Sequence, residues 1–112
     1  MAVSKKEVSE CPIDATLSVI DGRWKGTILW RLSQGPMRTS ELRHSIPWIT
    51  ERMLIRHLKE LVADGILVRT VEDPSHRRVL YSISEYGWTM APLLEAICAW
   101  GRNHIRVRNH CA

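Results

Sequence analysis

The chain has 112 residues, the length of one ordinary domain, and its 45% hydrophobic content excludes an intrinsically disordered protein. The formal net charge of +4 is compatible with a polyanionic partner but does not establish one. The three cysteines are odd in number and far apart, which excludes a secreted disulfide framework and a Cys-x-x-Cys zinc spacing. No apolar run is long enough to cross a bilayer and the N-terminus lacks the apolar stretch of a signal peptide, so we expect a cytoplasmic protein with no membrane partner.

The first third of the chain predicts a polar arm and two helices within a single domain over residues 1–112. Residues 1–10 are polar and are expected to be flexible. A helix is expected from Pro12, because proline suits the first helical position, to a stop at Gly22. A second helix is expected over 23–33, before a Gly-Pro pair.

Residues 36–83 have the order of elements of a winged helix-turn-helix. A short helix with Thr39 as its N-cap is followed by a break at 47–49, and Thr50 then caps a longer helix that ends near Gly65. One stripe of this longer helix is apolar and is expected to face the core. Its members are Met53, Leu54, Leu58, Leu61 and Val62.

Two strand-like segments, 66–72 and 79–83, flank a basic tip and predict a two-stranded wing. In the second segment the inward-facing side chains alternate with the others, as in a half-buried strand. A long closing helix is expected over 84–108, opened by Ser84 and kinked near its start by Pro92. The predicted fold is therefore mainly α: three N-terminal helices, a recognition helix, a small β-hairpin wing and a C-terminal dimerisation helix.

The fourth helix carries a cationic face that suits DNA. Arg52, Arg56 and Lys59 lie at spacings of four and three, so they share one side of the helix. Arginine can donate two hydrogen bonds to guanine, lysine binds phosphate, and an exposed Ile55 could contact a thymine methyl group. The basic wing tip would reach the neighbouring backbone or minor groove. The predicted DNA-binding residues are Ser40, Thr50, Glu51, Arg52, Ile55, Arg56, Lys59, His76, Arg77 and Arg78.

The closing helix is apolar on more than one side, and a domain this small cannot cover it alone. We therefore expect a homodimer formed by the first and last helices, which would place two recognition helices roughly 34 Å apart on a palindromic operator. The predicted interface residues are Leu17, Ile20, Leu93, Leu94, Ile97, Trp100, Gly101 and Ile105.

Cys11 is a candidate sensor of oxidants or electrophiles, because a helix N-terminus favours the reactive thiolate. The alternative is a small apolar residue that fills a gap beneath the interface. Cys98, on the apolar last helix, is expected in the core. The sequence has no glycine-rich phosphate loop, no nucleophile-base set and no trustworthy metal-ligand spacing, so we predict no enzyme, no cofactor and no metal.

With these residues identified, the chain resembles the HxlR family of bacterial transcription regulators, which are MarR-like winged-helix proteins. The matching segments cover about residues 11 to 104 in the family's order. They are Cys11-Pro12, Gly22-Arg23-Trp24-Lys25, Ile28-Leu29, Gly35-Pro36, Ser40-Glu41-Leu42-Arg43, Leu58-Lys59-Glu60-Leu61, Asp64-Gly65, Tyr81-Ser82-Ile83-Ser84-Glu85-Tyr86-Gly87 and Cys98-Ala99-Trp100-Gly101.

The resemblance implies a dimer that binds operator DNA through the fourth helix and the wing. It also implies that a cysteine matching Cys11 senses oxidants or electrophiles in some members. Two positions depart from the family: Ile55 stands where a small hydroxyl residue is common, and the tip 75–77 differs from proline-rich wings. Two competing hypotheses stay open, a winged helix that contacts protein rather than specific DNA, and an enzyme that uses Cys11 as its nucleophile.

Overall fold

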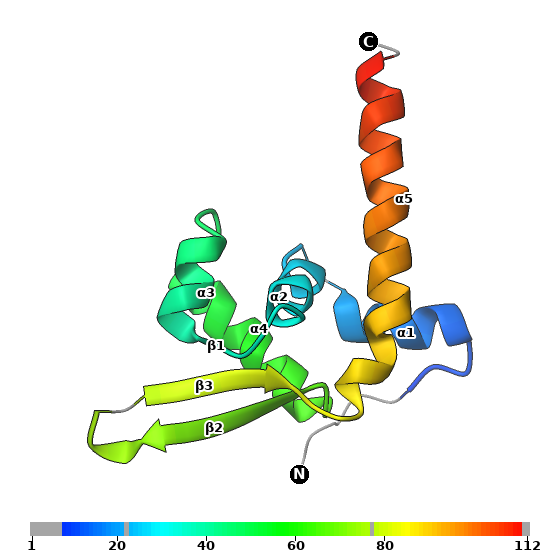
Figure 1. Cartoon of the computed structure of the whole chain (residues 1–112). Coiled ribbons are helices and arrows are strands. Elements are labelled where there is room, and N and C mark those ends of the chain that lie inside the picture. The colour runs from blue at the N-terminus through cyan, green and yellow to red at the C-terminus, as the bar shows by residue number, and fades with distance from the viewer. Residues whose placement is uncertain (1–7, 22, 77, 111–112) are drawn as a thin grey trace.

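Helices dominate the chain within residues 8–21, 23–76 and 78–110, which a computed structural model describes except for the side chains of His76 and His110 (Figure 1). In chain order the elements are α1 (Pro12–Ile20), α2 (Lys25–Leu32), β1 (Met37–Arg38), α3 (Thr39–Ser45), α4 (Glu51–Ala63), β2 (Leu67–Asp73), η1 (Pro74–His76), β3 (Arg78–Ile83), η2 (Gly87–Met90) and α5 (Ala91–His110). Four sequence expectations fall partly or wholly outside the described residues: the flexible arm, the helix stop at Gly22, the wing residue Arg77, and the side chain of His76.

The predicted winged helix-turn-helix is confirmed, with a sheet one strand larger than expected. The strand order is β1-β3-β2, and both pairings are antiparallel. In the wing Leu67 pairs with Ile83, and the ladder reaches Val71 opposite Val79 before a bulge. The third strand, β1, has only two residues, so it carries no periodic pattern that the sequence could have revealed.

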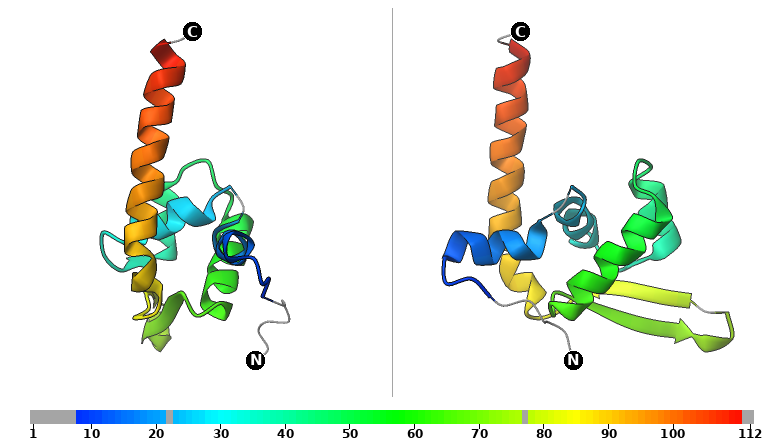
Figure 2. Two further views of the ribbon diagram at one scale, coloured as in Figure 1. Left: turned by 90° about the vertical axis from the view of Figure 1, so that its right-hand side faces the viewer. Right: turned by 180° about the vertical axis from the view of Figure 1, so that it is seen from behind.

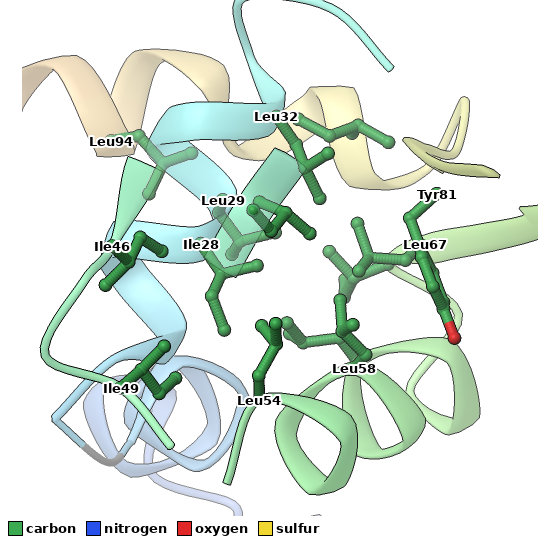
Figure 3. Packing of buried hydrophobic residues seen from close by; sticks show 14 residues of the cluster. Ile28, Leu29, Leu32, Ile46, Ile49, Leu54, Leu58, Leu67, Tyr81 and Leu94 are labelled. Atoms are coloured by element: carbon green, nitrogen blue, oxygen red, sulfur yellow. The ribbon is translucent and has the colours of Figure 1, made fainter. Parts of the chain in front are cut away.

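The core lies between α2, α3, α4 and the base of the sheet (Figure 3). Each apolar stripe of these elements turns inward, as the helical and strand periods predicted. The buried cluster consists of Ile28, Leu29, Leu32, Leu42, Ile46, Ile49, Leu54, Leu58, Leu61, Ile66, Leu67, Tyr81, Ile83 and Leu94. Helix α1 contributes no buried residue, and Val19 and Ile20 pack against the cluster from its edge.

The ends of α3 and α4 are fixed by capping contacts. The Thr50 hydroxyl accepts a hydrogen bond from the Met53 amide at 3.1 Å, which confirms the predicted N-cap of α4. The N-cap of α3 is Arg38 rather than the expected Thr39, because β1 ends there and the Glu41 carboxylate accepts from the Arg38 amide at 2.7 Å. Met53 is 40% exposed, so its predicted place in the core was wrong: it lies on the first turn of α4, at the edge of the stripe.

The closing helix starts later than predicted. Residues after β3 form a turn and the 3₁₀ segment η2, and α5 begins only at Ala91. Pro92 is therefore the second residue of α5, where its missing amide hydrogen has no helical partner to lose, so the expected kink inside a longer helix was wrong. Helix α5 continues to His110 and rises away from the rest of the chain (Figures 1 and 2).

The junction before α5 is held against the end of α4. The Ser84 hydroxyl donates to the Gly65 carbonyl at 2.7 Å and accepts from the Gly87 amide at 2.8 Å. A side chain at Gly87 would collide with the Ile66 carbonyl and the Ile83 methyl, so only glycine fits this buried position. None of the described helices combines the length and apolar character needed to cross a membrane.

Candidate nucleic-acid interface

Helix α4 presents a cationic face to solvent because its opposite, apolar face is buried in the core. Leu54, Leu58 and Leu61 are fully buried, which fixes the rotation of the helix about its axis. The side chains on the other side are exposed, including the guanidinium of Arg56, whose side chain is 75% accessible. The structure thus brings four of the predicted residues together on one open helix face. They are Arg52, Ile55, Arg56 and Lys59.

The N-terminus of α4 adds polar groups next to this face. Thr50 is exposed at the cap, and the helix dipole leaves a partial positive charge there. Glu51 does not stand free, because Arg43 of α3 contacts it at 3.0 Å between Nη1 and Oε1. Sequence reasoning missed this pair, since it joins two helices across the turn. Ser40 is exposed in the first turn of α3.

The turn between α3 and α4 exposes a large aromatic side chain. Trp48 is 77% accessible, whereas its neighbour Ile49 is buried in the core. Trp48 is therefore not part of the core. Trp48 lies two residues before the Thr50 cap, in the turn that leads into α4.

The wing extends beyond α4, as Figure 2 shows for β2 and β3. Near its tip the wing is tied to β1 by an ion pair between Arg38 and Glu72, at 3.1 Å. At the tip the Asp73 carboxylate accepts from both the amide and the hydroxyl of Ser75, which fixes the start of the turn. Arg78 is exposed at the start of β3. Of the other predicted wing cations, Arg77 and the side chain of His76 lie outside the described part of the chain.

A partly buried polar cluster joins α4 to α2 and was not expected. Lys25, the first residue of α2, is 4% exposed, and its Nζ lies 2.8 Å from Glu60 Oε1. The hydrogen bond from Lys25 holds the pKa of Glu60 below its usual range, although partial burial opposes this shift. His57 is also buried, with Nδ1 at 3.7 Å from the same Oε1 atom. A lysine at the first position of a helix opposes the macrodipole, and this was the available sequence signal of a long-range partner.

An apolar surface covers the outer sides of α1 and α5. Among the predicted interface residues, Leu17, Ile97, Trp100 and Ile105 are exposed, and Ile20, Leu93 and Gly101 are half-buried. Leu94 is only 7% exposed and belongs to the core of its own chain, so its assignment to the interface was wrong. Ile13, which was not among the predicted interface residues, is also exposed, and it lies with Leu17 and Ile97 in a groove between α1 and α5. The groove is lined by Pro12, Ile13, Thr16, Leu17, Ile20, Leu93 and Ile97.

Cys11 is exposed at the N-cap of α1, as the sequence predicted for a helix start. Its carbonyl accepts from Ala15 at 2.9 Å and its amide donates to Ser9 at 3.1 Å, so the backbone around the thiol is held. Cys98 is half-buried rather than fully in the core, and it lines a groove between α2 and α5.

A profile of the HxlR-like helix-turn-helix matches residues 19–109, which is most of the chain. The chain belongs to the HxlR family. This agrees with the resemblance seen in its motifs, and it makes the chain a transcriptional regulator of the HxlR type.

Similar proteins agree with this membership. The uncharacterized HTH-type transcriptional regulator YtcD of Bacillus subtilis is 45% identical over 101 residues, which cover 90% of this chain and 80% of YtcD. The redox regulator HypR in its reduced form is similar in structure, with 38% identity, a TM-score of 0.84, and coverage of 89% of this chain and 99% of HypR. Diamide-treated YodB from B. subtilis has 32% identity and a TM-score of 0.70, covering 83% of this chain and 93% of YodB.

Proposed function

We propose that this HxlR-family protein is a homodimeric, sequence-specific DNA-binding regulator that inserts α4 into the major groove. The observation that carries the proposal is the outer face of α4, where Arg52, Arg56 and Lys59 are exposed beside Ile55. Arginine can donate two hydrogen bonds to one guanine, and an aliphatic side chain suits a thymine methyl group. The buried stripe on the opposite side keeps this face turned outward.

The wing and the N-terminus of α4 supply the contacts that position the duplex. Arg78 on β3 suits the phosphate backbone, as do the Ser40 and Thr50 hydroxyls. The sequence also places His76 and Arg77 in the wing tip, for the same role. Phosphate contacts of this kind set the register of a protein on DNA but carry no base information.

The apolar faces of α1 and α5 support pairing of two chains. Exposed Leu17, Ile97 and Trp100 would leave a contiguous apolar surface in water if the chain stayed alone. A two-fold dimer through these helices would present two copies of α4 to one side of a duplex, at half-sites about one turn apart. The corresponding operator is palindromic.

The direct test is selection of duplexes from a random pool by the wild-type protein, followed by gel shifts with the enriched sequence. Changing Arg52 or Arg56 to alanine is expected to cost about 1–3 kcal/mol of binding free energy where either reads a base. The matched control is Arg108→Ala, which removes the same charge from the distal part of α5. Wild-type affinity in the Arg52→Ala, Arg56→Ala double variant would contradict the proposal.

The alternative is a winged helix that binds another protein, with a cationic face that is merely solvated. It predicts that the random pool yields no enriched sequence and that no promoter fragment is retarded. A stable complex with a protein partner, together with that absence of retardation, would favour it over DNA recognition.

We further propose that Cys11 links DNA binding to oxidants or reactive electrophiles. Its exposed thiol at the start of α1, on the proposed dimer surface, supports this role. Structures of oxidised and reduced HypR and of quinone-bound YodB, both related proteins, support it too. The test compares DNA affinity before and after diamide or a quinone in wild type, Cys11→Ser and the matched control Cys98→Ser. Equal responses of wild type and Cys11→Ser would remove Cys11 from the mechanism.

A further inference from the structure

The polar cluster between α2 and α4 places the carboxylate of Glu60 among three basic side chains. Glu60 Oε1 lies 2.8 Å from Lys25 Nζ and 3.7 Å from His57 Nδ1, while Oε2 lies 3.7 Å from Arg56 Nε. Lys25 comes from α2, and the other three residues come from α4. The carboxylate therefore connects the buried body of the protein with a cation on the outer face of α4.

Lys25 is buried where a cation is locally unfavourable. It is 4% exposed and occupies the first position of α2, at the positive end of the helix dipole. A buried ammonium needs a close anionic partner, because desolvation of an unpaired charge is expensive. Glu60 is that partner, and Lys25 therefore fixes both the position of Glu60 Oε1 and its ionised state.

The second oxygen of Glu60 then acts on Arg56. A guanidinium approached through Nε keeps its two terminal amino groups for another ligand, such as a guanine edge or a phosphate. Because Lys25 neutralises the carboxylate, the positive charge of Arg56 is directed outward instead of being cancelled within α4. Without Lys25, the Glu60 carboxylate would turn fully to Arg56 and would also repel a nearby phosphate.

We propose that Lys25 is a positioning residue for DNA recognition, acting through Glu60 to hold Arg56 in its binding orientation. This inference rests on the proposed function, since it assigns the origin of one specificity contact made by α4. Lys25 itself touches no DNA.

The experiment measures fluorescence anisotropy of a duplex enriched by the wild-type protein, over a range of salt concentrations, with a scrambled duplex as reference. Lys25→Met should weaken binding to the enriched duplex about tenfold, within the range of coupling between contacting residues. The slope of the logarithm of the binding constant against the logarithm of the salt concentration should also fall in magnitude by about one. Arg56→Met should have the same effect, because in both variants Arg56 no longer contacts phosphate or base. The Lys25→Met, Arg56→Met double variant should bind no more than about twofold more weakly than Arg56→Met alone.

A purely structural role for Lys25 predicts a different pattern. Losses that add in the double variant, with an unchanged salt slope for Lys25→Met, would overturn the inference. Should Lys25→Met fail to fold, the Lys25→Met, Glu60→Gln variant removes both charges and avoids an unpaired buried ion. It should keep binding to the scrambled duplex and lose about tenfold of its preference for the enriched one, and wild-type preference would overturn the inference. Failure of the pool to yield any enriched duplex would instead overturn the proposed function, and the inference with it.

Discussion

The two halves of the molecule bury their apolar side chains by different means. The half formed by α2, α3, α4 and the sheet encloses its own core, and Leu58 and its neighbours there are inaccessible to solvent. The half formed by α1 and α5 leaves its apolar side chains open. No residue of α1 is buried, and Leu94 is the one described residue of α5 that is.

This contrast separates what the chain can do alone from what the proposed second copy would add. A self-contained core gives α4 a fixed orientation, which a DNA-reading helix requires. Among the described side chains of α5 only Leu94 is buried, so this long helix obtains little stability from its own domain, and a partner chain as proposed would supply the missing contacts. The open half is thus suited to an interface, and the closed half to recognition.

The largest expected effect tests the closed half. Leu58→Ala removes a fully buried side chain between α4 and the rest of the core, and should lower the free energy of unfolding by about 3 kcal/mol. Leu17→Ala, on the open face of α1, should change it by less than about 0.5 kcal/mol when the protein is diluted to monomers. Urea titrations followed by circular dichroism measure both. Similar losses in the two variants would break the comparison.

The next effect concerns the open half. Ile97→Asp places a charge in the exposed apolar face of α5 and should raise the dimer dissociation constant by at least about 30-fold, or about 2 kcal/mol. Ala99→Asp is the matched control, because position 99 lies on the opposite side of the same helix, with Glu95 and Arg102. Sedimentation velocity distinguishes them, and a dimer that tolerates Ile97→Asp would move the interface elsewhere.

A smaller effect shows that an exposed residue can still matter in the closed half. Thr50→Ala removes the hydroxyl that caps α4 and should destabilise the protein by about 1 kcal/mol. Thr50→Ser keeps the acceptor and should retain most of the stability. Thermal unfolding of the three proteins provides the measurement, and equal losses in the serine and alanine variants would exclude capping as the cause.

Local patterns predicted most of the closed half. The core positions Leu54, Leu58 and Leu61 of α4, its Thr50 cap and its end at Gly65, where φ is 78°, depend on near neighbours in sequence, and these were predicted. The strand β1 was missed because two residues have no period. The place of Leu94 in the core could not be derived either, because α5 is apolar on more than one side and its local sequence does not determine which side packs on the rest of the chain.

In the candidate site, too, the features set by local sequence were predicted and those set by long-range contacts were not. Exposure of the α4 cations follows from helical spacing, whereas the pairing of Lys25 with Glu60 joins residues far apart in sequence. No local pattern encodes such a contact. The wrong assignment of Met53 has a related cause, since the edge of a stripe is buried only if the neighbouring helix covers it.

The smallest expected effect sharpens the comparison at this pair. Because Lys25 lowers the pKa of Glu60 in the folded chain, the pair stabilises the protein above the ordinary carboxyl pKa of 4.5, and this contribution is lost as pH falls through the lower folded value. The Glu60 side chain is 43% exposed, so solvent screening keeps the pH-dependent part below about 1 kcal/mol. The difference in unfolding free energy between wild type and Glu60→Gln should therefore shrink from pH 7 to pH 3.

A carboxylate of the open half supplies the control for that measurement. Glu95 is exposed on α5 and takes part in none of the ion pairs described for the closed half, so wild type and Glu95→Gln should differ by the same small amount at both pH values. If the Glu95→Gln difference shrank as much as that of Glu60→Gln, the acid sensitivity would come from the net charge of the protein rather than from the contact between α2 and α4. If only the Glu60→Gln difference shrank, the acid sensitivity would come from the ion pair between Lys25 of α2 and Glu60 of α4.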